Sequence, residues 1–170
     1  PFIAAVNGVA MGGGFEIALA CDLIIAAESA SFALPEPLVG AVALGGGLHR
    51  LARQIGTKPA MGMILTGKRV SAAEGLRLGF VNEVVPDAEL LNITRRWCGE
   101  ILKCSPMSVR ASKETVLRGI EEPSLAAAMS AQERYPAFAA WRSSDDAREG
   151  PRAFAEKRPP RWQGRTGDPQ

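Results

Sequence analysis

Residues 3–22 read IAAVNGVAMGGGFEIALACD, and this stretch decides the fold class. An apolar run over residues 2–6 ends at Asn7-Gly8, which is a turn signal, and predicts a buried strand. Gly12-Gly13-Gly14 then leads into FEIALA, which is typical of a helix. The next segment, DLIIAA at 22–27, is continuously apolar, as in a parallel strand that is covered on both faces. A strand, a helix and a second buried strand together predict an α/β protein.

From residue 87 onward, the pattern changes from strands and helices to helices alone. Short strands are expected at 31–33 and 80–85. Helices are expected at 48–54, 57–65, 71–78, 87–103, 106–119, 124–142 and 144–157, followed by a tail rich in Pro, Gly and Arg at 159–170. Ser71 and Glu74 fit a capping box, in which Glu74 reaches back to the helix start. We therefore expect a partial α/β core over residues 1–103 and a helical region over 104–170 that serves subunit contacts.

The composition is that of an ordinary globular protein. The chain has 170 residues, of which 46% are hydrophobic and 22% charged, and its net charge of +2 is too small to indicate nucleic-acid binding. No apolar run reaches the roughly 18 to 20 residues that span a membrane, and no signal peptide is visible. Cys21, Cys98 and Cys104 are an odd number without metal-ligand spacing, which predicts reduced thiols, no metal site and a cytoplasmic location.

The first residues already have the pattern of a buried strand. A natural protein seldom begins inside its core, so we expect that further sequence precedes Pro1. We also expect the 170-residue chain to be inactive without that sequence.

Three features near the start of the chain suit one kind of chemistry. Gly12-Gly13-Gly14 opens a helix, whose first N–H groups are unpaired and can hold negative charge on a carbonyl oxygen. Glu16 lies in an apolar helix start, and Glu36 lies between two prolines that fix the backbone. Taken singly, these features also fit a tight turn, a carboxylate that complements the helix dipole and a surface loop. Taken together, they predict proton transfer beside a carbonyl, or the positioning of a water.

Other catalytic motifs find no support in the sequence. His49 is the only histidine, so no Ser–His–Asp set is indicated. The glycines are not followed by Gly-Lys-Ser/Thr, as a nucleotide-binding P-loop requires, and their spacing does not match a dinucleotide-binding fingerprint.

Several segments resemble the enoyl-CoA hydratase/isomerase (crotonase) family, in the family's own order. They are IAAVNGVAMGGGFEIALACD at 3–22, SFALPE at 31–36, LTGKR at 65–69, GFVNEVV at 79–85 and EGPRAFAEKR at 149–158. Within the family, four features look most like the carnitinyl-CoA dehydratase branch: Phe15 before the first glutamate, FALPE at 32–36, Tyr135-Pro136 and Trp162-Gln163-Gly164.

The resemblance implies a crotonase-like fold of stacked ββα units, with a C-terminal helical region that forms homotrimers or hexamers. It implies that Gly13 donates its N–H to the thioester oxygen and that Glu16 and Glu36 are the catalytic glutamates. Residues implied to contact the substrate are Gly12, Gly14, Leu34, Pro35, Leu44, Phe154 and Lys157, the last two reaching the CoA bound by a neighbouring subunit. Coenzyme A is then part of the substrate, and no separate cofactor is expected.

Two features depart from the family pattern. The second oxyanion donor and much of the CoA surface come, in the family, from an N-terminal segment that is not part of this sequence. VALGGGL at 42–48 replaces the commoner proline-containing loop that ends in Gly-Gly-Thr, a change that bears on acyl specificity.

The expected activity is reversible syn hydration of a 2-enoyl-CoA, with Glu16 activating water for attack at C3 and Glu36 protonating C2. An enoyl-CoA isomerase is the nearest alternative, although isomerases of the family often keep only the second glutamate. A non-catalytic acyl-CoA-binding protein is another. A nucleic-acid binder using the basic C-terminal end is a third, opposed by the acidic residues interleaved there.

Overall fold

The computed structural model describes residues 1–164 and divides the chain into two compact units. One unit is Phe2–Trp97, here called the α/β unit, and the other takes in Pro1 and the chain from Cys98 onward, here called the helical unit. The change of unit falls within one helix, six residues before the boundary expected from the sequence.

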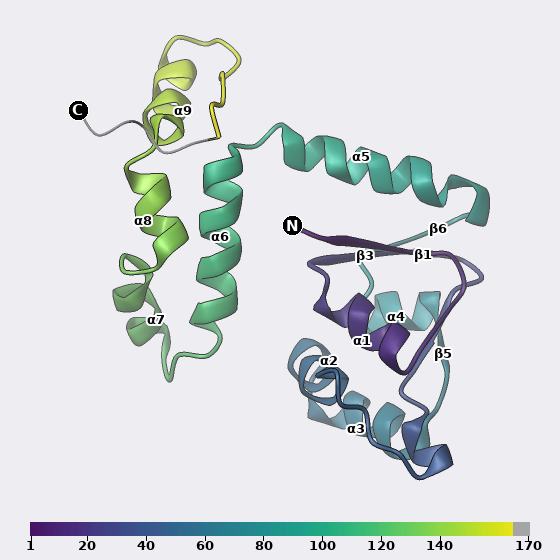
Figure 1. Cartoon of the computed structure of the whole chain (residues 1–170). Helices are drawn as coiled ribbons and strands as arrows, with labels where there is room; N and C mark the ends of the chain where they lie inside the picture. Colours follow the sequence, from purple (N-terminus) through teal and green to yellow (C-terminus); the bar gives the residue numbers. More distant parts are fainter. Residues whose placement is uncertain (165–170) are drawn as a thin grey trace. The chain divides into compact units, whose positions relative to one another are not determined.

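Two small sheets carry the α/β unit (Figure 1). The first has the order β1-β3-β6, all parallel, with Ile3 opposite Leu23 and Ile25 opposite Glu83. The second has the order β2-β4-β5, with β2 parallel and β5 antiparallel to β4. The strands are β1 (Ile3–Val6), β2 (Val9–Met11), β3 (Leu23–Ala27), β4 (Ser31–Ala33), β5 (Val70–Ser71) and β6 (Glu83–Val85). The expected α/β class with parallel strands is thus confirmed.

Helices complete the α/β unit. They are α1 (Gly13–Ala20), η1 (a 3₁₀ turn, Glu36–Val39), α2 (Gly47–Ile55), α3 (Thr57–Thr66), α4 (Ala72–Leu78), η2 (a second 3₁₀ turn, Asp87–Glu89) and the start of α5 (Leu90–Leu102). In Figure 1, α1 and α4 lie on one side of the β1-β3-β6 sheet, and the first turns of α5 lie on the other. Leu90, Ile93 and Trp97 of α5 pack against the same core.

Three phenylalanine rings form the centre of this core. Phe15 of α1, Phe32 of β4 and Phe80 lie with their ring centroids 5.1–5.2 Å apart, within the range of favourable aromatic pairs. Helix α4 approaches them closely at Gly75, where a β-carbon would lie 2.8 Å from Phe80. The rings therefore join the helix that carries Glu16 to the strand that leads to Glu36.

The helical unit contains α6 (Pro106–Gly119), α7 (Leu125–Gln132), α8 (Pro136–Arg142) and α9 (Asp145–Ala155). Ser105, Ser124 and Ser144 cap α6, α7 and α9 by accepting a first-turn N–H on their hydroxyl oxygens. Glu114 of α6 accepts the N–H of Ala137 at 2.6 Å, which satisfies an amide at the start of α8.

The structure corrects the sequence prediction at several places. The helix expected over 124–142 is broken, because Pro136 lacks an N–H and begins the separate helix α8. The short strands β2 and β5 were not predicted. Ser71 caps α4, but Glu74 pairs with Arg77 at 2.6 Å rather than reaching back. Residues 165–170 of the expected tail lie outside the described part of the chain.

In the part of the chain that the structure describes, the helices are too short or too polar to cross a bilayer.

Candidate active site

The turn between β2 and α1 depends on Gly12. Its φ of 53° and ψ of −126° are disfavoured for residues with a side chain, and its N–H donates to the Ala33 carbonyl at 3.0 Å. This bond continues the pairing of β2 with β4 and aims the chain into α1. The triple glycine therefore begins a helix, as the sequence predicted, and the structure places the start of that helix beside the end of β4.

Open space lies in front of the first turn of α1. Gly13 and Gly14 are exposed, and a β-carbon at either position would meet nothing within 4 Å. The Gly13 N–H is in the first turn, where the helix itself offers no acceptor. The positive end of the helix dipole lies here as well, so an oxygen with developing negative charge would be stabilised at this position.

Glu36 places its carboxylate beside the same turn. It is the first residue of η1, directly after Pro35, and its Oε1 lies 3.0 Å from where a β-carbon of Gly12 would be. Its Oε2 is buried and, within residues 1–164, is the one buried side-chain oxygen or nitrogen without a hydrogen-bond partner. An unpaired buried acceptor is costly, and this oxygen is free to accept a hydrogen bond from a bound molecule.

Glu16 is held one turn into α1. Its N–H donates to the Gly12 carbonyl at 2.9 Å, and the residue is only 8% exposed between the buried Phe15 and the buried Ala18 and Leu19 on the next turn. Its Oε1 accepts the N–H of Gly47, the first residue of α2, at 2.8 Å. Sequence reasoning missed this partner, although the Gly45-Gly46-Gly47 run before the helix was a visible signal.

Both glutamates thus lie near the glycine turn that begins α1. Glu36 lies beside Gly12, the residue that precedes Gly13, and Glu16 follows three residues after Gly13 on the same helix. A buried and a half-buried carboxylate next to an anion-stabilising helix start suit acid–base chemistry on a carbonyl compound.

The sequence of the chain is similar to those of known proteins. The family model for enoyl-CoA hydratase/isomerase matches residues 1–165. The chain belongs to the enoyl-CoA hydratase/isomerase family. A carnitinyl-CoA dehydratase of Salmonella agona (strain SL483) is 44% identical over 169 residues, an alignment that covers 97% of this chain and 64% of the relative. The chain therefore spans about 64% of the length of the curated relatives it matches.

Solved structures of enoyl-CoA hydratases have the same fold. Subunit I from Geobacillus kaustophilus HTA426 matches with a TM-score of 0.90 at 43% identity, covering 97% of this chain and 63% of that chain. The enoyl-CoA hydratase from Bacillus anthracis matches with a TM-score of 0.90 at 40% identity, covering 96% and 62%. The expected crotonase-like fold is confirmed.

The remaining residues implied by the family resemblance lie in both units. Leu34 is fully buried and lies next to Gly47, whose N–H binds Glu16. A β-carbon of Gly47 would lie 3.2 Å from Leu34 Cδ2. Pro35 is half-buried, whereas Leu44 is 91% exposed. Phe154 is 88% exposed and Lys157 has a φ of 51°, and both belong to the helical unit, so their part in CoA binding stays a prediction.

Two carboxylates of the helical unit, those of Asp146 and Glu149, are each bound by several hydrogen-bond donors. Burial opposes ionisation of Asp146, but hydrogen bonds from Ser105, Gln163, Gly164 and Met107 outweigh it and lower the pKa. The Arg158 guanidinium and the Arg161 N–H lower the pKa of Glu149 to about 2. These contacts fasten the segment after α9 to the rest of the helical unit.

Residues 1–164 contain no cluster of three or more His, Cys, Asp or Glu side chains that would form a metal site. The candidate site comprises Glu16, Glu36 and the backbone amides at the start of α1.

Proposed function

We propose that this protein catalyses reversible syn hydration of a 2-enoyl-CoA thioester. The observation that carries the proposal is the Glu36 carboxylate, which has one oxygen against Gly12 and a buried second oxygen without a partner. A second carboxylate, Glu16, lies on the adjoining helix turn. Two carboxyl groups give the site one group to activate water and another to deliver a proton.

Each residue has one role in the proposed reaction. The thioester oxygen accepts the Gly13 N–H, beside Gly12 and Gly14, which polarises the double bond. Glu16 takes a proton from water as the water oxygen bonds to C3, and Glu36 gives a proton to C2. Dehydration reverses these steps, so atoms and charge balance. Losing one oxyanion donor of this kind typically slows a reaction about 100- to 1000-fold.

The finer proposal is the carnitinyl-CoA dehydratase type. It rests on the 44% identity to proteins of that name over nearly the whole chain. In the proposed enzyme Leu34, Pro35 and Leu44 border the acyl group. Coenzyme A enters as part of the substrate, without a further cofactor.

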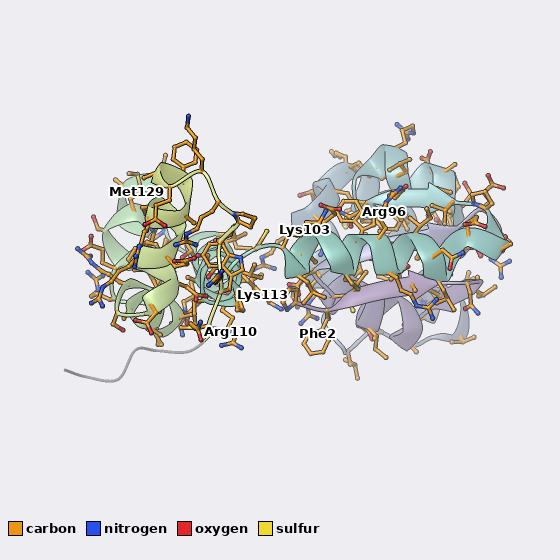
Figure 2. All side chains as sticks on the ribbon, turned by 90° about the horizontal axis from the view of Figure 1, so that it is seen from above. Phe2, Arg96, Lys103, Arg110, Lys113 and Met129 are labelled. Carbon is orange, nitrogen blue, oxygen red and sulfur yellow. The ribbon has the colours of Figure 1, made fainter. Side chains whose placement is uncertain are left out.

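The proposed assembly is a cytoplasmic homotrimer or hexamer built by the helical unit. This unit exposes large apolar side chains on α6, α7 and α9, including Val116, Met129 and Phe154. Met129, labelled in Figure 2, is 65% exposed. In the assembly Phe154 and Lys157 would reach the CoA of a neighbouring subunit.

A panel of CoA thioesters tests the function. Hydration of a 2-enoyl-CoA and dehydration of carnitinyl-CoA are expected, each followed by absorbance of the conjugated thioester. Turnover of a 3-enoyl-CoA without water addition would replace the proposal with an isomerase. Tight acyl-CoA binding without any turnover would replace it with a binding protein, and steeply salt-dependent binding of DNA would favour the nucleic-acid alternative.

A further inference from the structure

The loop before α2 does more than connect two elements. We propose that Gly45, Gly47 and Arg50 form a positioning device for Glu16, which fixes the oxygen that serves the attacking water. This inference rests on the proposed function and adds three residues to its machinery.

Gly47 supplies the directional contact. Its N–H donates to Glu16 Oε1 at 2.8 Å, and both residues are buried. An amide N–H donates but does not accept, so Oε1 is committed as an acceptor and a proton arriving at the carboxyl group goes to Oε2. The contact therefore selects which Glu16 oxygen exchanges protons with water.

Gly45 and Gly47 also supply the space. A β-carbon at Gly45 would lie 2.7 Å from Glu16 Oε2 and 2.9 Å from Cδ, and one at Gly47 would lie 2.8 Å from Glu16 Cγ. Both approaches are shorter than real β-carbons make, so any side chain at these positions displaces the carboxylate. Since Gly45 has no left-handed φ, the close approach is the reason for glycine there.

Arg50 holds the loop from outside. It lies one turn into α2, and its Nη1 donates to the Gly45 carbonyl at 2.8 Å. The guanidinium lies against Gly46, which has a φ of 92° and where a β-carbon would be 2.3 Å from Nη1. This bond ties the loop to the helix whose first amide holds Glu16.

Alanine substitutions test the spatial part. Gly45→Ala and Gly47→Ala are expected to lower kcat for hydration about 100-fold with little change in KM, because roughly 1 Å of misplacement costs that much. Gly62→Ala is the matched control, since Gly62 lies in α3 with nothing near its β-carbon position, and it should keep wild-type kcat.

A second readout separates positioning from general damage. In D₂O, Glu36 should remove a C2 hydrogen of a saturated acyl-CoA and return a deuteron, with the enolate held at the helix start. This exchange does not use Glu16, so the Gly45→Ala and Gly47→Ala variants should keep it within a few-fold while losing hydration. Equal loss of both reactions, or loss of neither, would overturn the inference.

Arg50→Gln keeps the test decisive even if the glycine variants fail to fold. It should lower kcat about tenfold, as expected for one charge-assisted hydrogen bond. The control is Arg53→Gln on the same helix, whose arginine makes only a 3.4 Å contact with the His49 carbonyl. Equal kcat for Arg50→Gln and Arg53→Gln would refute the role of Arg50. Absence of hydration in the wild-type protein would instead refute the proposed function.

Discussion

Glu16 and Glu36 in the α/β unit are held by fewer donors than Asp146 and Glu149 in the helical unit. Glu16 accepts one backbone N–H, and Glu36 leaves a buried oxygen unpaired. Asp146 accepts the Ser105 hydroxyl at 2.7 Å and the Gln163 N–H at 2.8 Å, and Glu149 accepts both Arg158 Nη atoms at 2.6 and 3.0 Å. Saturated carboxylates of the second kind stabilise a fold, whereas spare acceptor capacity leaves the first kind able to act on a ligand.

The largest expected effect comes from removing the charge of Glu16 or Glu36, the carboxylates with few hydrogen-bond donors. Glu36→Gln should reduce hydration about 100- to 10,000-fold, the usual contribution of a general acid, and should cost little free energy of unfolding because Glu36 Oε2 has no hydrogen bond to lose. Glu16→Gln should reduce it within the same range. Steady-state kinetics and urea titration measure the two quantities. If both variants hydrated the substrate at the wild-type rate, the claim that Glu16 and Glu36 act in catalysis would be wrong.

The opposite outcome is expected for Asp146, which is only 2% exposed. Asp146→Asn replaces one of two accepting oxygens with an NH₂ group, which would face hydrogen-bond donors. The substitution should lower the free energy of unfolding of the helical unit by about 3 kcal/mol. Trp162 contacts Gly150 of α9, so its fluorescence reports unfolding of this unit. The exposed neighbour Asp145→Asn is the control, and equal stability of the two variants would contradict the structural role of Asp146.

A pH titration sharpens the same contrast. The pKa of Glu149 is lowered to about 2 from its usual 4.5, so its ionised form is favoured by folding. The resulting stability is fully present above about pH 4.5 and is lost as the pH falls toward 2. The melting temperature of the Glu149→Gln variant should therefore fall less between pH 4.5 and pH 2 than that of the wild-type protein. The control is Glu121→Gln at an exposed site, which should keep the wild-type fall.

The smallest effect is expected at Glu74, a paired carboxylate on the surface. Its 2.6 Å ion pair with Arg77 lowers its pKa, but solvent screens the pair. Glu74→Gln should shift the melting temperature by no more than the scatter between replicate scans. A clear loss of stability would show that an ion pair on the surface stabilises the fold as much as a buried, hydrogen-bonded carboxylate does.

Local signals in the sequence predicted much of this arrangement. The glycine run, Glu16 and Glu36 lie within 25 residues of one another, and the helix and strand periods around them are clear. The contact of Glu16 with Gly47 spans 31 residues, so the glycine run at 45–47 signals the start of a helix but does not reveal that Glu16 is its partner. Burial of Asp146 also depends on distant partners, because an aspartate after Ser144 equally fits an exposed helix start. Strand β5 has two residues, too few to show a period.

The three-ring core has a consequence for how new activities could arise on this scaffold. Phe15 precedes Glu16 directly, and Phe32 lies four residues before Glu36, so packing among the rings sets the separation of the two acids. Leu38, Val39, Val42 and Leu44 are exposed and lie outside that packing. Laboratory selection for an altered acyl preference can therefore vary these four exposed positions while the ring packing keeps the spacing of Glu16 and Glu36.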